Sequence, residues 1–199
     1  WTGPGFTIGA GHNQKPVRVP AKPRKKKPTS VIELRSVKPH HRYGMGGRSR
    51  KMGEIYKLIE VTAPSSSDVL ITGESGTGKS ALARAIHFRS PRGNRPFREI
   101  PCAQLPYNLL ESELFGHERG AFTGATQRKL GLCELADGGT LFLDDINVVP
   151  GEMQAKLLRF IENKSFIRLG GTQDLSADVR IVAASNEDLE ALSYEGRFR

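Results

Sequence analysis

With 199 residues, the chain is long enough for one domain with a sizeable core, and an apolar content of 37% leaves part of the chain outside that core. No uninterrupted apolar run approaches the ~20 residues that a membrane span needs, which argues against a membrane protein. The two cysteines are too few for a disulfide scaffold, and the five histidines are scattered, so no metal centre is indicated. Reduced, buried thiols in a cytoplasmic protein are expected.

The net charge of +9 is unevenly distributed along the chain. Residues 1–51 hold 13 basic residues and one acid, a charge of +12, whereas the remainder holds 17 basic and 20 acidic residues, a charge of −3. Residues 1–28 show no hydrophobic period and are expected to be disordered, within a basic tail or linker over 1–43. The run Arg24–Lys27 is either a solvated linker, the more common case, or a weak contact for DNA or another acidic surface.

From residue 44 onward, the apolar pattern predicts strands that alternate with helices. Helices are expected at 50–61, 81–88, 109–115 and 152–161, and strands at 69–71, 97–102, 140–143 and 180–184, with a strand of a hairpin within 165–169. The strand at 180–184 is apolar enough to be buried on both faces. This alternation is typical of an α/β fold in which helices sandwich a parallel sheet, and it assigns residues 44–199 to one domain.

The segment Gly73–Ser80, GESGTGKS, fits the pattern G-x-x-x-x-G-K-[ST] between a predicted strand and a predicted helix. In such a P-loop, backbone N–H groups and the helix N-terminus face the phosphates of a nucleoside triphosphate. Lys79 would bring positive charge to the β- and γ-phosphates, and Ser80 a hydroxyl to Mg²⁺. The flanking elements disfavour the alternative, an ordinary glycine-rich turn. The expected nucleotide-binding residues are Gly73, Glu74, Ser75, Gly76, Thr77, Gly78, Lys79 and Ser80.

An acidic pair, Asp144 and Asp145, ends the predicted strand that follows the P-loop by about sixty residues. A P-loop enzyme needs a carboxylate beside the triphosphate to help hold Mg²⁺, and Asp144 is the natural metal partner. Asp145 is placed to orient or deprotonate the attacking water. Such a pair can also be a turn or a helix cap, but the neighbouring P-loop makes that interpretation much weaker.

The segment Glu113–Ala125, ELFGHERGAFTGA, combines glycines with one aromatic residue, Phe122, and a hydroxyl neighbour, Thr123. These residues indicate a flexible loop that presents Phe122 to something outside the domain. From the residues alone, a loop whose phenylalanine packs back onto the core is the more common alternative.

Four strings together resemble bacterial sigma-54-dependent transcription activators, enhancer-binding proteins of the AAA+ ATPase class. The strings are GAFTGA at Gly120–Ala125, the P-loop GESGTGKS, GGTLFLDDI at Gly138–Ile146 and DVRIVAASNEDLE at Asp178–Glu190. The resemblance runs from about Gly44 to Arg199. It implies the AAA+ form of the P-loop fold, with the helical lid and a C-terminal helix-turn-helix lying beyond this fragment. Specific DNA binding would belong to that missing domain.

The resemblance also implies partners and roles. ATP binding and hydrolysis in a homo-oligomeric, usually hexameric, ring would drive the GAFTGA loop against sigma-54 and remodel the closed complex of RNA polymerase. By this carry-over, Phe122 and Thr123 make the sigma contact, Ser185 and Asn186 sense the γ-phosphate, and Arg199 acts on the nucleotide of a neighbouring subunit. The turn Gly46-Gly47 would lie near the adenine. The partner-binding residues implied are Gly120, Ala121, Phe122, Thr123, Gly124 and Ala125.

Two departures from the family pattern bear on turnover. The family usually has Glu where this chain has Asp145, and Asn where it has Pro101. A carboxylate one methylene shorter and a proline without an amide side chain would slow or uncouple hydrolysis while leaving binding intact. The leading interpretation is therefore an ATPase module of a sigma-54 activator. The alternatives are a nucleotide- and sigma-binding fragment without effective hydrolysis and, more weakly, a nucleic-acid-binding protein that works through residues 15–27.

Overall fold

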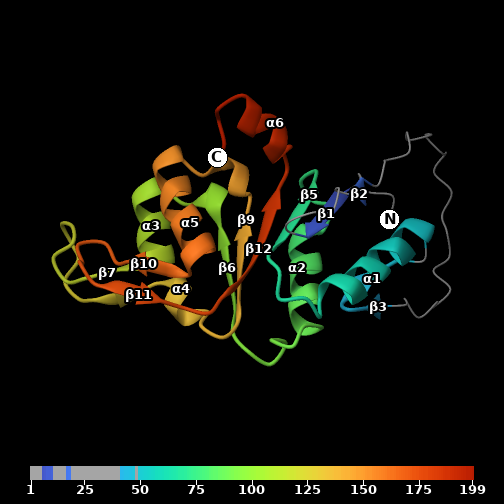
Figure 1. Cartoon of the computed structure of the whole chain (residues 1–199), viewed down its shortest axis with the longest axis horizontal. Coiled ribbons are helices and arrows are strands. Elements are labelled where there is room, and N and C mark those ends of the chain that lie inside the picture. Colours follow the sequence, from blue (N-terminus) through green and yellow to red (C-terminus); the bar gives the residue numbers. More distant parts are fainter. Residues whose placement is uncertain (1–5, 11–16, 19–40, 48) are drawn as a thin grey trace, which may run out of the picture.

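The computed structural model describes residues 6–10, 17–18, 41–47 and 49–199. Within these ranges, six strands form one sheet in the order β2-β1-β5-β12-β9-β6 (Figure 1). Its members are β1 (Phe6–Ala10), β2 (Val17–Arg18), β5 (Val69–Gly73), β6 (Phe97–Pro101), β9 (Thr140–Asp144) and β12 (Arg180–Ser185). Strands β5, β12, β9 and β6 run parallel, and β1 joins β5 in the antiparallel direction.

Helices cover both faces of the sheet (Figure 1). They are α1 (Arg50–Thr62) and α2 (Lys79–Phe88) on one face, α3 (Tyr107–Phe115), α4 (Leu132–Leu135) and α5 (Gly151–Asn163) on the other, and α6 (Leu189–Tyr194) after β12. The alternation of side chains along β9 builds both cores, because successive residues of a strand point to opposite faces. Leu141 and Leu143 pack in the core with α3 and α5, while Phe142 packs in the core with α1 and α2.

Short hairpins and turns complete the domain. These are β3 (His41–Arg42) with β4 (Met45–Gly46), β7 (Gly116–His117) with β8 (Lys129–Leu130), β10 (Ser165–Ile167) with β11 (Asp174–Ser176), and the 3₁₀ turns η1 (Cys102–Gln104) and η2 (Ile146–Val148). All the helices and strands expected from the sequence between residues 44 and 199 are present, and the parallel α/β fold between helices is confirmed. Helix α2 begins at Lys79 rather than at 81, because the P-loop leads directly into it.

The N-terminal segment differs in part from the sequence expectation. Disorder was expected throughout residues 1–28, but the structure forms strands at Phe6–Ala10 and Val17–Arg18. Strand β1 lies between β2 and β5 and pairs with both, so main-chain hydrogen bonds hold it and it needs little apolar surface of its own. The basic run Arg24–Lys27 lies outside the described residues, and the expectation of a disordered linker there remains a prediction.

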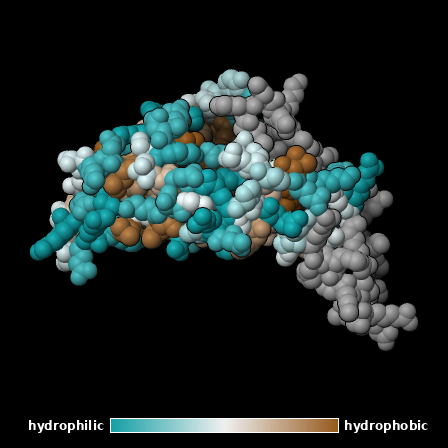
Figure 2. All heavy atoms as spheres, turned by 60° about the horizontal axis from the view of Figure 1, so that its bottom comes forward, coloured by the Kyte–Doolittle hydropathy of each residue, from teal (hydrophilic) through white to brown (hydrophobic). Residues whose placement is uncertain are grey.

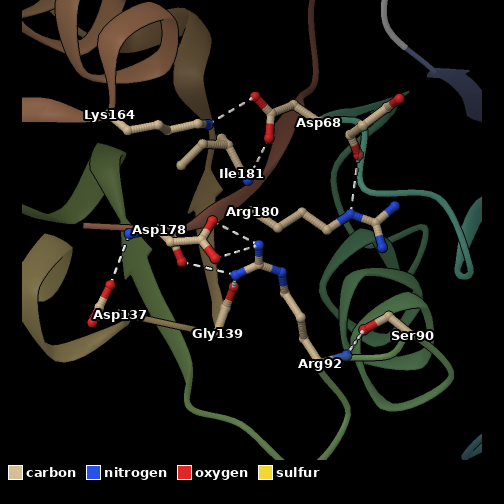
Figure 3. A network of polar contacts seen from close by, with 10 residues as sticks. Asp68, Ser90, Arg92, Asp137, Gly139, Lys164, Asp178, Arg180 and Ile181 are labelled. Carbon is tan, nitrogen blue, oxygen red and sulfur yellow. Dashed lines mark hydrogen bonds and ion pairs between the residues drawn. The ribbon is translucent and has the colours of Figure 1, made fainter. Parts of the chain in front are cut away.

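Charged side chains form hydrogen bonds and ion pairs at the amino ends of the parallel strands (Figure 3). Arg92 donates to both carboxylate oxygens of Asp178, at 2.7 and 2.9 Å, and to its backbone carbonyl oxygen. Asp68 accepts from the amide of Ile181 at 2.7 Å and binds the Lys164 ammonium at 3.3 Å. These contacts fix the edge of the sheet opposite the strand ends that carry the sequence motifs.

In the part of the chain that the structure describes, no helix is long and apolar enough to cross a membrane. The face drawn in Figure 2 is mostly hydrophilic, and its apolar groups are scattered between polar ones.

Candidate nucleotide site and partner loop

The sequence motifs meet at one edge of the sheet, because the carboxyl ends of parallel strands lie together. Gly73, Asp144 and Ser185 are the last residues of β5, β9 and β12. In the strand register, Ser185 lies beside Thr72 of β5 and Pro101 lies beside Asp144. Segments more than a hundred residues apart in the sequence therefore form one candidate site.

The P-loop has the backbone that its glycines predict. Gly76 and Gly78 have φ angles of +76° and +95°, which side-chain-bearing residues rarely adopt. Gly78 is the N-cap residue of α2 and has no side chain, so no side-chain hydrogen bond caps the first turn of this helix. The amide groups at that end of the helix are therefore available to an anion, as the motif predicts.

Lys79 is buried, with 7% of its surface exposed, and its ammonium group lies against the loop. The Nζ atom donates to the carbonyl oxygens of Gly73 at 2.9 Å and Glu74 at 3.2 Å. These two contacts hold the cation inside the curve of the P-loop, the position that a phosphate-binding lysine requires. The contacts also satisfy a charge that would be costly to bury alone.

The hydroxyl of Ser80 connects the P-loop to Asp144 at the end of β9. Its Oγ donates to Oδ2 of Asp144 at 3.3 Å, and Oδ1 of Asp144 accepts from the amide of Asp145 at 3.2 Å. Burial and the neighbouring Asp145 charge raise the pKa of the Asp144 carboxyl, while the Ser80 hydrogen bond and the Lys79 charge lower it; burial dominates. The pair predicted as metal ligands is thus brought together across the site.

Asp145 has an unusual backbone for a residue with a side chain. Its φ and ψ are 53° and 52°, in the left-handed region that aspartate tolerates better than most residues. The conformation turns the chain from β9 into η2. Cys102, the residue after Pro101, lies close enough that the charges of Asp144 and Asp145 add to burial in raising the pKa of its thiol to about 12. Pro101 thus ends its strand beside the acidic pair, where the family pattern has Asn.

The predicted sensor residues lie at the end of β12, with different surroundings. Ser185 is fully buried, and its hydroxyl donates to the carbonyl oxygen of Glu187 at 2.6 Å and accepts from the Glu187 amide at 3.1 Å. This side chain closes a turn, which is a common role of a polar residue at a strand end. Asn186 is exposed. A role for either residue in sensing phosphate remains a prediction.

Arg199 is exposed, and its backbone amide donates to Oε1 of Gln154 on α5 at 2.9 Å. Gln154 is buried at 6% exposure and was not singled out in the sequence. The available signal was a polar residue at a position that the helical period assigns to the apolar face of α5, next to Met153 and ahead of Leu157.

The GAFTGA segment lies in the loop between β7 and β8, at the end of the molecule opposite α1 (Figure 1). Phe122 is 44% exposed and meets the His117 ring edge-on, with ring centroids 4.9 Å apart. The phenylalanine therefore does not enter either core. Within the loop, the Gly120 amide donates to the Ala125 carbonyl at 2.8 Å, and Gly124 has a φ of +102°. The tip is a compact turn that presents Phe122 and Thr123.

A buried arginine that the sequence did not single out supports this loop. Arg168, beyond β10, is 5% exposed and donates to Glu118 at 2.7 Å and to Glu134 at 2.9 Å. The Glu118 amide also donates to the Leu169 carbonyl at 3.0 Å. The GAFTGA loop is thereby joined to the β10–β11 hairpin.

Comparisons with known proteins agree with this arrangement. Residues 45–199 match the model of the sigma-54 interaction domain. The chain is 52% identical over 153 residues to the Nif-specific regulatory protein of Herbaspirillum seropedicae, covering 77% of the chain and 28% of that protein. It is 53% identical over 151 residues to the regulatory protein AtoC of Escherichia coli, covering 76% of the chain and 33% of that protein.

Solved structures agree as well. The crystal structure of NtrX from Brucella abortus superposes with a TM-score of 0.71 at 40% identity, covering 77% of this chain and 34% of that one. The structure of the same protein in complex with ATP superposes with a TM-score of 0.69 at 39% identity, covering 77% of this chain and 33% of that one. The chain spans about a third of the length of these relatives. With the family model matching most of its residues and the fold agreeing, the chain belongs to the sigma-54 interaction domain family.

Proposed function

We propose that this chain is the ATP-binding and ATP-hydrolysing module of a sigma-54-dependent transcription activator. The observation that carries the proposal is the meeting of the P-loop lysine, the Ser80–Asp144 pair and Asp145 at one edge of the sheet. The ATP complex of NtrX, 39% identical to this chain, supports ATP as the nucleotide. Family membership supports sigma-54 as the partner.

The residues present fit a magnesium ion. Mg²⁺ prefers oxygen ligands, and Ser80 and Asp144 offer a hydroxyl and a carboxylate oxygen 3.3 Å apart. When bound, the ion would neutralise developing phosphate charge. Lys79 would leave its two loop carbonyls for the β- and γ-phosphates. Asp145 would orient or deprotonate the attacking water. The remaining P-loop residues, together with Ser185 and Asn186, would surround the nucleotide.

Arg199 would complete the site of a neighbouring copy in a homo-oligomeric ring. An arginine supplied in trans stabilises transition-state charge and is worth roughly 10³–10⁵ in rate in well-studied NTPases. The exposure of Arg199 supports this role, since a buried guanidinium could not reach another subunit. Hydrolysis in the ring would then drive the loop 120–125 against sigma-54 and remodel the polymerase closed complex.

Replacing Thr123 by alanine is expected to weaken binding of sigma-54 about tenfold, the equivalent of one hydrogen bond of about 1.4 kcal/mol, and to leave ATP affinity unchanged. Thr123 is exposed in the loop between β7 and β8, which Figure 1 shows well apart from β5 and α2. Fluorescence anisotropy with labelled sigma-54 and Mg²⁺-ATP measures the first effect. Thr172→Ala, at an exposed threonine outside the GAFTGA segment, is the matched control. Equal sigma affinity for wild type and Thr123→Ala would contradict the assigned contact.

The second candidate function is a module that binds nucleotide and sigma-54 without effective hydrolysis. Asp145 and Pro101 favour it, since they stand where the family pattern has Glu and Asn, and Pro101 lies beside Asp144, the residue before Asp145. If the shorter carboxylate limits the rate, Asp145→Glu is expected to raise kcat, by up to about 10², because a misplacement of about 1 Å can cost that much. Steady-state phosphate release measures this. Wild-type turnover that Asp145→Glu leaves unchanged would count against a misplaced acid.

A further inference from the structure

We infer that Gln154 is a positioning residue that fixes where the backbone of Arg199 lies relative to β9, the strand that ends in Asp144. The inference rests on the proposed function, in which Arg199 serves a neighbouring site. The Gln154 side chain makes three hydrogen bonds. Its Nε2 donates to the Val149 carbonyl at 2.8 Å and to the Arg197 carbonyl at 3.3 Å, and its Oε1 accepts from the Arg199 amide at 2.9 Å.

The burial of Gln154 makes these bonds specific. A buried amide without partners costs free energy, so its donors and acceptor fix which backbone groups must face it. Gln154 stands in the first turns of α5, between Met153 and the rest of the apolar face. Figure 1 shows the C-terminus of the chain beside this end of α5. The side chain therefore bridges two segments that are more than forty residues apart.

Gln154 also connects Arg199 to the catalytic acid. Val149 follows Asp145 through the η2 turn, in which the Val148 amide donates to the Asp145 carbonyl at 3.3 Å and the Val149 amide to the Ile146 carbonyl at 3.2 Å. A shift of this turn would move the Val149 carbonyl and, through the shared amide group, the backbone of Arg199. Through Gln154, the backbone after Asp145 in one nucleotide site is therefore connected to Arg199, which would act on the nucleotide of a neighbouring copy.

The other anchors of this segment come from α6. The amides of Arg197 and Phe198 donate to the Leu192 carbonyl at 2.9 and 3.1 Å, and the Phe198 side chain packs against the core. These contacts keep the segment folded if Gln154 is changed. Gln154 fixes where the Arg199 backbone lies relative to α5 and β9, while the guanidinium stays exposed.

Gln154→Met is the variant that tests the inference, because methionine has a similar length and no hydrogen bonds to offer. ATP affinity is expected to stay within about twofold, and kcat at a high chain concentration to fall about 10–100-fold. Glu162→Met, at an exposed position of the same helix, is the control and should match wild type. A cooperative thermal transition confirms folding. If Gln154→Met fails to fold, Gln154→Asn keeps the amide group on a side chain one methylene shorter and is expected to lose turnover in the same direction.

Mixing variants separates positioning of Arg199 from a general structural effect. A Lys79→Ala copy binds no ATP but carries an intact Arg199 segment, so adding it to Gln154→Met copies should restore at least half of the lost turnover per competent ATP site. Arg199→Ala mixed with Lys79→Ala should behave in the same way. Asp145→Ala mixed with Lys79→Ala should stay inactive, since neither copy has both ATP and the acid.

The outcomes distinguish the inference from the proposed function. Unchanged turnover in Gln154→Met, or a loss that Lys79→Ala copies do not restore while Arg199→Ala is restored, overturns the inference alone. A wild-type chain without turnover overturns the proposed hydrolysis, and the positioning role is overturned with it.

Discussion

Replacing Lys79 by alanine is expected to abolish measurable binding of Mg²⁺-ATP. This is the largest effect on nucleotide affinity that we expect from any single substitution. The Lys79 ammonium is held in the P-loop by the Gly73 and Glu74 carbonyls, at 2.9 and 3.2 Å. A hydrogen bond to a charged group contributes about 1.5–3 kcal/mol, and two such contacts with phosphates correspond to a loss of roughly 10²–10⁴ in affinity. Isothermal titration calorimetry with ATP measures the change.

The control for Lys79→Ala is Lys57→Ala, because Lys57 is exposed on α1. It removes the same charge and should leave ATP affinity unchanged. A rise in salt concentration should weaken wild-type binding less than it weakens an exposed ion pair, since Lys79 is buried. ATP affinity within threefold of wild type in Lys79→Ala would contradict the assignment of the P-loop as the site.

Replacing Arg180 by methionine is expected to give the largest loss of stability. Arg180 is 2% exposed, and its guanidinium donates to the carbonyl oxygens of Thr62, Ala63 and Ser67 at 2.9, 2.9 and 3.0 Å. Figure 3 shows it reaching from β12 toward the segment before β5. The Thr62 and Ala63 carbonyls lie at the C-terminal end of α1, where the last carbonyls have no partners within the helix. Removing the guanidinium leaves the buried Ala63 carbonyl unpaired and takes a hydrogen bond from the Thr62 and Ser67 carbonyls, which should cost about 3–5 kcal/mol in total.

For a domain of this size, that loss corresponds to a fall in Tm of about 10 °C. Chemical denaturation and a thermal scan measure both quantities. Arg159→Met, at a half-exposed arginine of α5 that pairs with Asp174, should change the free energy of unfolding by no more than about 0.5 kcal/mol. Equal losses in the free energy of unfolding for the two variants would show that the buried hydrogen bonds of Arg180 contribute no more to stability than a surface ion pair.

Local patterns were sufficient to predict the parallel α/β fold after residue 44 and to predict which segments meet at the carboxyl ends of its strands. The P-loop and the acidic strand end are each contained in fewer than ten consecutive residues, and parallel strands bring their carboxyl ends together wherever they lie in the chain. The expected elements after residue 44 were therefore found with small shifts at their ends. The GAFTGA loop was likewise identified before its exposure was known.

The contacts that join distant segments could not be predicted in this way. Arg168 reaches acids 34 and 50 residues away, and Gln154 reaches backbone groups 43 and 45 residues away. Periodicity reports which face of an element is apolar, but it does not identify the partner of a polar residue on that face. The left-handed backbone of Asp145 was missed for a related reason, since aspartate adopts that conformation only where its surroundings require it.

The most direct test of the account is the rate of ATP hydrolysis per chain as the chain concentration rises, at saturating Mg²⁺-ATP. An arginine supplied in trans makes each site depend on a neighbour, so the specific activity should rise with concentration and be lost in Arg199→Ala. A specific activity that is independent of concentration, or ATP binding with no turnover at any concentration, would contradict the ring ATPase. The second result would instead identify a module that binds nucleotide without hydrolysing it.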